Sequence, residues 1–244
     1  MALLADLRVL YHLAVKPVRG RDHAERMESF YSGQADAYDD FRRRLLKGRK
    51  EMYSSLELPD AGVWVDMGGG TGSNVEYRAE DIDRLKSVYV VDLSKSLLEV
   101  ADKRFKARGW SNARACTADA TKFQPPESVD VVTFSYSLTM IPDWFAAIEN
   151  ALRMLRPGGQ IGVVDFYVSR KYPQATAERH AWWTRHFWPA WFGNDNVFPS
   201  ADHLPYLHGH FEPVSVGEHR AKIPYLPFVR APYYTFVGKK SESV

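Results

Sequence analysis

Short apolar runs recur through the middle of the chain, and several of them end at an acidic or small polar residue. The runs cover Val63–Val65, Ser87–Val91, Ala113–Ala118, Val129–Phe134 and Gln160–Asp165. A helical segment from Trp144 to Leu155 precedes the last of these. Two later runs lie near Glu212–Glu218 and Tyr233–Val237. Strands that alternate with helices are typical of an α/β fold with a mainly parallel sheet. The pattern therefore predicts a Rossmann-like, doubly wound sheet.

The first run leads directly into a glycine loop. After Asp66 and Met67, glycine occupies four of the five positions from Gly68 to Gly72. Glycine lets the backbone bend sharply and approach a ligand, and a helix that starts there aims free N–H groups above the sheet. The second run ends at Asp92, where such a sheet holds an acid for ribose hydroxyls. The loop has no GxxxxGK[ST] lysine, which excludes a triphosphate-binding loop.

Four motifs, in this order and spacing, resemble those of the class I S-adenosylmethionine-dependent methyltransferases. They are DMGGGTG at 66–72, Asp92, the pair Asp119-Ala120, and LRPGG at 155–159. The resemblance covers about residues 60–167. It implies a seven-stranded sheet, S-adenosylmethionine as cofactor and S-adenosylhomocysteine as its product. The cofactor-binding residues that it implies are Asp66, Gly68, Gly70, Thr71, Gly72, Asp92, Leu93, Asp119, Ala120 and Ser135. The alternative is a doubly wound fold that binds another nucleotide.

The region before the first strand is expected to cover the site. An apolar stripe from Leu3 to Val15 has helical spacing and a basic end, so it either docks on the domain, which we expect, or lies on a membrane surface. Tyr31 and Tyr38 are candidates to cover the sulfonium or bind the methionine carboxylate. Arg42 is a candidate for a substrate carboxylate, or part of a solvated face. We expect helices over 1–58 and the methyltransferase domain over 59–244, with 168–211 as a substrate lid.

The last third is rich in aromatic residues. Trp182, Trp183, Trp188 and Trp191 fall within ten residues, between the fifth and sixth strands. The sheet does not need them, so this insertion predicts an apolar lid for a hydrophobic substrate or a belt at a membrane interface, with Trp182, Trp183 and Trp188 as substrate residues. The alternative is that about half of the rings form a small core. His203, His208 and His210 lack a nearby cysteine, and no metal site is expected.

Several stretches outside the generic motifs resemble the betaine-lipid synthase family. They are FYSGQADAYDDFRRRLLKGR at 30–49, FSYSLTMIPDW at 134–144 and HAWWTRHFWPAWFGNDNVFP at 180–199, together with VDMGGGTGSN at 65–74. The resemblance implies three N-methylations of diacylglyceryl-homoserine, which give diacylglyceryl-trimethylhomoserine. Some members are fused to the aminocarboxypropyl transferase that makes this substrate. We expect such a domain to be a fused or associated partner, with the polar end of the chain as a linker.

Methyl transfer to an amine needs positioning and a proton acceptor, because an α-amino group is mostly protonated near neutral pH. Tyr136, after the fourth strand, is the candidate to orient the amine. Asp165, at the end of the fifth strand, and His180 are candidate acceptors. The structural alternatives are a core ring for Tyr136, a helix cap for Asp165 and a surface position for His180.

Composition and charge limit the kinds of partner that we expect. The net charge of +2 combines an acidic cofactor half with basic flanks, and these flanks are suited to an anionic surface. No NPPY-type motif follows the fourth strand, so nucleic acid is not expected. Cys116 is the single cysteine, which fits a cytoplasmic protein, and we expect peripheral association with a membrane (the endoplasmic reticulum face in a eukaryote). Alternative functions are quinone or polyketide methylation, methylation of phosphoethanolamine or phosphatidylethanolamine, and a cofactor-binding scaffold without turnover.

Overall fold

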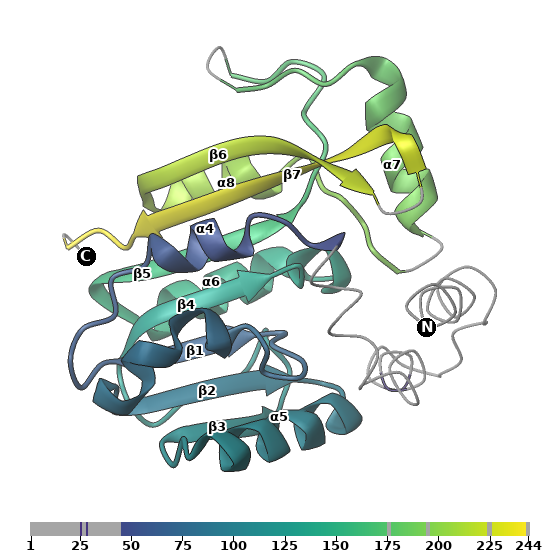
Figure 1. Cartoon of the computed structure of the whole chain (residues 1–244). Coiled ribbons are helices and arrows are strands. Elements are labelled where there is room, and N and C mark those ends of the chain that lie inside the picture. The colour runs from purple at the N-terminus through teal and green to yellow at the C-terminus, as the bar shows by residue number, and fades with distance from the viewer. Residues whose placement is uncertain are drawn as a thin grey trace.

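The computed structural model describes Glu25, Glu28 and residues 45–174, 177–193, 196–223 and 226–242 (Figure 1). The strands are β1 Val63–Met67, β2 Ser87–Asp92, β3 Ala113–Thr117, β4 Val129–Ser135, β5 Leu155–Phe166, β6 Glu212–Ile223 and β7 Leu226–Lys239. The helices are α4 Arg49–Ser54, α5 Lys95–Arg108, α6 Trp144–Met154, α7 Trp182–Gly193 and α8 His203–His210, with 3-10 helices η1 Val75–Arg84 and η2 Leu138–Met140.

These strands form one seven-stranded sheet in the order β3-β2-β1-β4-β5-β7-β6. The pairs from β3 to β5 are parallel, whereas β7 runs antiparallel to both β5 and β6. The predicted doubly wound, seven-stranded fold is confirmed. Because β1 pairs with β2 on one side and β4 on the other, the order of the strands reverses beside it. In such sheets the crevice at the carboxyl ends of the reversing strands is where ligands bind.

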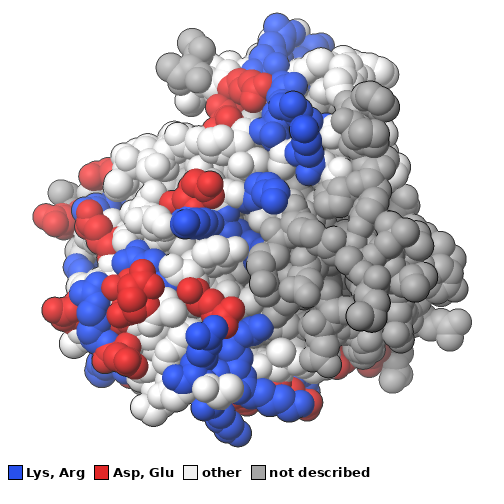
Figure 2. Space-filling view, in the orientation of Figure 1, with Lys and Arg blue, Asp and Glu red and all other residues white. Residues whose placement is uncertain are grey.

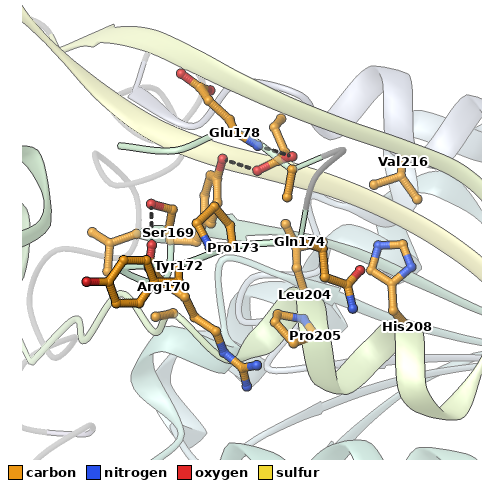
Figure 3. Close-up of a pocket in the computed structure, with 15 residues that line it drawn as sticks. Ser169, Arg170, Tyr172, Pro173, Gln174, Glu178, Leu204, Pro205, His208 and Val216 are labelled. Carbon is orange, nitrogen blue, oxygen red and sulfur yellow. Dashed lines mark hydrogen bonds between the residues drawn. The ribbon is translucent and has the colours of Figure 1, made fainter. Parts of the chain in front are cut away.

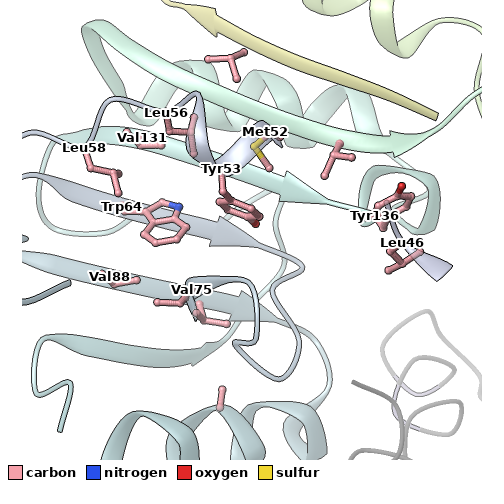
Figure 4. Packing of buried hydrophobic residues seen from close by; sticks show 14 of the residues in the cluster. Leu46, Met52, Tyr53, Leu56, Leu58, Trp64, Val75, Val88, Val131 and Tyr136 are labelled. Atoms are coloured by element: carbon pink, nitrogen blue, oxygen red, sulfur yellow. The ribbon is translucent and has the colours of Figure 1, made fainter. Parts of the chain in front are cut away.

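Helices cover both faces of the sheet, and β1 shows how the sequence divides its side chains between them. Trp64 packs with Tyr53 of α4 and Phe105 of α5, while Val65 and Met67 pack with α6 and α8 residues on the other face. This is the alternation that a strand requires. Figure 4 shows the first cluster, in which the rings of Tyr53 and Trp64 lie 5.8 Å apart.

Some element boundaries differ from those expected. The strand predicted from Gln160 begins at Leu155, and its register with β4 shifts between Val129 and Val131, beside the RPGG segment. The last two strands are longer than expected because they form an extended antiparallel ladder, with Glu212 opposite Lys239. An edge strand with many exposed residues, such as β6, has little apolar alternation, so its length was not visible in the sequence.

Candidate active site at the carboxyl ends of the strands

The glycine loop after β1 adopts a conformation that other residues would resist. Gly68, Gly70 and Gly72 have φ angles of 66°, 56° and 68°. A Cβ on Gly68 would lie 2.4 Å from the Cβ of Ser137, so the loop presses directly against the segment that follows β4. Beneath the loop, the buried Asp66 carboxylate accepts hydrogen bonds from Thr133 Oγ1 at 2.6 Å, Tyr53 Oη at 3.0 Å and Asn74 Nδ2 at 3.0 Å. These hydrogen bonds fix the Asp66 side chain beneath the loop.

Two carboxylates lie beyond the loop, at the ends of neighbouring strands. Asp92, at the end of β2, accepts hydrogen bonds from the amides of Gly70 and Ser94, each at 2.9 Å. Asp119 follows β3, and its Oδ1 accepts from the amide of Thr121 at 2.9 Å. Both carboxylates are partly exposed. The amide N–H groups fix both carboxylates just beyond the carboxyl ends of β2 and β3.

Other predicted cofactor residues divide into exposed and buried ones. Leu93 and Ala120 are partly exposed beside these carboxylates. The carbonyl of Ala120 accepts from Asn150 Nδ2 at 3.0 Å, which fixes the segment after β3. Thr71 is buried and its carbonyl accepts from Arg104 of α5. Ser135, at the end of β4, is also buried.

Four aromatic rings line the neighbouring ends of β4 and β5. Tyr136 has a positive φ of 54°, and its ring meets Phe166 edge-on with centroids 4.7 Å apart. Phe166 stacks on Phe192 of α7 at 4.6 Å, and Phe192 stacks on Trp188 at 5.3 Å. We call Tyr136, Phe166, Trp188 and Phe192 the aromatic wall. It lies next to the glycine loop because β4 pairs with β1.

Comparison with known proteins shows which family has this arrangement of motifs. The family described as "Methyltransferase domain" matches residues 65–159, which include the glycine loop and both carboxylates. The chain carries a class I S-adenosylmethionine-dependent methyltransferase domain. The predicted enzyme class is thereby confirmed at the level of the domain, whereas the narrower resemblance to betaine-lipid synthases stays a prediction.

Individual relatives of the methyltransferase domain differ in what they act on. A demethylmenaquinone methyltransferase of Geobacillus stearothermophilus is 30% identical over 138 residues, which are 56% of this chain and 55% of that protein. The chain therefore spans just over half of this relative's length. Among solved structures, a methyltransferase from Bacillus halodurans aligns with a TM-score of 0.63 and 15% identity, over 80% of this chain and 99% of that one.

A second solved structure holds ligands. It is a phosphoethanolamine N-methyltransferase 2 of Haemonchus contortus in complex with phosphomonomethylethanolamine and S-adenosylhomocysteine. It aligns with a TM-score of 0.65 and 15% identity, over 93% of this chain and 61% of that one. At such identities the likeness concerns the fold alone.

Both predicted proton acceptors are buried and lie beyond the residues that the family matches. Asp165 has no exposed surface and accepts from Thr139 Oγ1 at 2.7 Å, from the Phe166 amide at 2.8 Å and from the Thr139 amide at 3.1 Å. Burial raises the pKa of this carboxyl to about 7, against the lowering effect of the Thr139 bonds. The two bonds with Thr139 connect Asp165 to the short helix η2. The catalytic role of Asp165 stays a prediction.

The second candidate, His180, is also buried, which differs from the surface position considered above. Its Nδ1 accepts from the Ser169 amide at 3.0 Å, and burial lowers the pKa of its ring. Tyr136 is nearer to the cofactor loop, but its hydroxyl donates to the carbonyl of Lys47 at 2.7 Å. The described bonds of both residues are thus internal, and their roles in methyl transfer stay predictions.

The predicted substrate tryptophans do not lie together. Trp188 is buried in the aromatic wall, while Trp182 and Trp183 are 70% and 52% exposed. The reason is the helix itself, because residues five or six positions apart in α7 point in different directions at 3.6 residues per turn. Tyr31, Tyr38 and Arg42 lie outside the described residues, as does most of the 1–58 segment.

Arg49 is a site residue that the sequence analysis missed. It lies in α4, is 3% exposed and donates to Asn74 Oδ1 at 3.4 Å, just past the glycine loop. Burial raises the pKa of the Tyr136 phenol, and the charge of Arg49 acts in the opposite direction, so this cation lies near both the loop and the wall. The feature of the sequence that could have identified Arg49 is its spacing to Met52 and Tyr53, which places it on the buried side of α4.

A separate pocket of about 470 Å³ lies between α8 and β6 (Figure 3). Its lining includes Tyr167, Leu204 and Val216. Tyr167 packs in the cluster on the face of the sheet opposite Phe166, and its hydroxyl donates to Glu218 at 2.7 Å. None of the four residues of the aromatic wall lines this pocket.

No described helix is both long and apolar enough to cross a membrane. Within the part of the chain that the structure describes, no cluster of three potential metal ligands occurs.

Proposed function

We propose that this domain transfers the methyl group of S-adenosylmethionine to an apolar or amphipathic acceptor that is held against the aromatic wall. The observation that carries the proposal is that the glycine loop with its two carboxylates and the aromatic wall, whose four rings are buried, lie at the ends of neighbouring strands. The loop, Asp92 and Asp119 lie at the ends of β1, β2 and β3, while the aromatic wall lies at the ends of β4 and β5. A donor at the loop would present its sulfonium to an acceptor at the wall.

The proposed donor site uses the partly exposed carboxylates. The two oxygens of Asp92 accept from the ribose hydroxyls, while Asp119 accepts from the exocyclic amine of adenine and the Ala120 N–H donates to the ring. Arg49 supplies a buried positive charge on the loop side of the wall, which suits the carboxylate of the methionine moiety. This orientation directs the methyl group toward Tyr136.

The wall suits the chemistry because a sulfonium is already activated. The protein has mainly to hold the acceptor in line with the S–CH₃ bond. Rings stabilise the cationic sulfonium through cation–π attraction, and they do the same for a methylated ammonium product. They form no ion pair with that product, so it can leave.

For the acceptor, we propose the amine of diacylglyceryl-homoserine, methylated three times. Support comes from the stretches that resemble betaine-lipid synthases, two of which, at 134–144 and 180–199, supply three residues of the wall: Tyr136, Trp188 and Phe192. A quinol is the second candidate, because the named relative of Geobacillus methylates demethylmenaquinone. An apolar wall fits either acceptor, and a quinol would be methylated on carbon instead of nitrogen.

An acceptor panel tests the assignment. The full chain is incubated with methyl-labelled S-adenosylmethionine and, separately, diacylglyceryl-homoserine, demethylmenaquinol, phosphatidylethanolamine or phosphoethanolamine, and the products are identified by mass. We expect mono-, di- and trimethylated diacylglyceryl-homoserine. Turnover of the quinol alone would replace the lipid assignment with quinone methylation. Binding of the donor without turnover of any acceptor or of a total lipid extract would indicate a scaffold.

A further inference from the structure

Helix α7 contributes to the aromatic wall with one side and exposes rings on another. Thr184, Trp188 and Phe192 recur every four residues and are all buried. The same spacing one position earlier gives Trp183, Phe187 and Trp191, of which Trp183 is 52% and Trp191 45% exposed. Trp191 stacks on Phe187 with centroids 5.7 Å apart. The helix therefore exposes Trp183 and Trp191 to solvent, with the partly buried Phe187 between them, next to its buried stripe.

Further exposed rings come from the first residue of the helix and from the segments that flank it. Trp182 is 70%, Tyr172 74% and Phe198 59% exposed. Phe198 lies at the end of α7, since a Cβ on Gly193 would be 3.9 Å from its ring. We call Tyr172, Trp182, Trp183, Trp191 and Phe198 the outer aromatic surface. Large exposed apolar patches mark interaction sites, and tryptophan and tyrosine are enriched where a protein meets lipid headgroups.

Positive charges lie beside the Tyr172 ring, which also lines the pocket between α8 and β6. Lys171 Nζ lies 5.3 Å and the Arg179 guanidinium 5.8 Å from the centroid of the Tyr172 ring. Lys222 and Arg230 are exposed and face each other across β6 and β7. Figure 2 shows Lys and Arg side chains gathered at the upper edge of the molecule, where Figure 1 draws the segment before α7. The nearby Glu178 is already paired with Arg220. The combination of rings and cations complements an anionic lipid surface.

We propose that the outer aromatic surface docks on a bilayer that contains anionic lipids. The rings enter the headgroup region, and Lys171 and Arg179 contact phosphates, each strengthening the binding by about fivefold. This inference deepens the proposed function and rests on it for the acceptor, because docking brings a lipid acceptor to the helix whose buried stripe forms the wall. A water-soluble acceptor would need no such surface.

Vesicle co-sedimentation of the full chain tests the docking without any need for turnover. The wild-type protein is expected to bind phosphatidylcholine vesicles that contain phosphatidylglycerol more tightly than vesicles of phosphatidylcholine alone. The Trp183→Ala/Trp191→Ala double variant should bind the anionic vesicles at least about tenfold more weakly, because two rings no longer leave water. Phe145→Ala is the matched control, since this ring is 49% exposed on α6 and should not contribute.

Three outcomes would overturn the docking. The first is wild-type protein that stays in the supernatant with anionic vesicles. The second is a double variant that sediments with the vesicles as wild type does. The third is a double variant that binds vesicles as wild type does but self-associates less than wild type in gel filtration, which would make the surface a protein interface. Circular dichroism and thermal melting check that the double variant is folded. If vesicle binding depends on the tryptophans but no lipid is methylated, the docking stands and the proposed acceptor fails.

Discussion

Two aspartates at the ends of strands have opposite surroundings, and this difference separates their roles at the scale of single residues. Asp92 is partly exposed and is held by two backbone amides. Asp165 is fully buried, and burial raises its carboxyl pKa to about 7. A partly exposed carboxylate can accept hydrogen bonds from hydroxyl groups of a ligand. The buried Asp165 carboxyl makes the stability of the fold depend on pH, and its catalytic role stays a prediction.

Replacement of Asp92 by alanine should weaken the binding of S-adenosylhomocysteine. The loss is expected to be about 1.5–3 kcal/mol, the scale of hydrogen bonds to a charged group. Isothermal titration calorimetry measures it directly. Asp102→Ala, on the exposed side of α5, is the control and should bind as wild type does. Unchanged affinity in a folded Asp92→Ala variant would remove Asp92 from the cofactor site.

The raised pKa of Asp165 makes a prediction about pH and stability. The unfolded chain ionises this carboxyl near pH 3.8 and the folded protein near pH 7. Between these values the folded state binds more protons than the unfolded state. The free energy of unfolding therefore falls as pH rises through this window, and the contribution of Asp165 is lost completely above pH 7. The difference corresponds to up to about 4 kcal/mol.

Urea unfolding of wild type and Asp165→Asn at pH 5 and pH 8 checks this effect. The wild type should lose more stability between the two pH values than the variant, whose amide does not titrate. Any constant cost of the substitution cancels in this comparison. Parallel pH profiles would mean that the Thr139 and Phe166 donors keep Asp165 ionised throughout.

At the scale of elements, α7 contributes to both aromatic features of this molecule. Its buried stripe completes the aromatic wall, and its exposed stripe forms the outer aromatic surface. The sequence showed the cluster of tryptophans but not this division. Exposure depends on which side of the helix meets Phe166, a contact between residues that are far apart in the chain. The motifs at the strand ends were easier to predict, since each one combines a strand and its loop within a few residues.

The division of α7 can be tested through stability. Trp188 is fully buried, so Trp188→Ala should reduce the free energy of unfolding by about 3–5 kcal/mol. Trp191→Ala, in the exposed stripe, should cost less than about 1 kcal/mol. Chemical denaturation measures both values. Similar losses for the two variants would show that the exposed stripe is packed in solution, against a segment or a second molecule.

At the scale of the whole molecule, the sheet separates two tasks on either side of β1. The strands β1, β2 and β3 end in the loop and acids proposed for the donor, and β4 and β5 end in the proposed acceptor wall. The sequence predicted that the glycines and acids of the first half lie at strand ends, and their roles in binding the donor stay predictions. It missed Arg49, whose side chain is buried, although the spacing of Arg49 to Met52 and Tyr53 places it on the buried side of α4.

A crystal structure of the chain with S-adenosylhomocysteine tests this division most directly. We expect ribose hydroxyls within hydrogen-bond distance of Asp92, adenine beside Asp119 and Ala120, and the sulfur atom directed at the wall of Tyr136, Phe166, Trp188 and Phe192. A nucleoside bound elsewhere, or a sulfur atom that opens toward the pocket between α8 and β6, would contradict it.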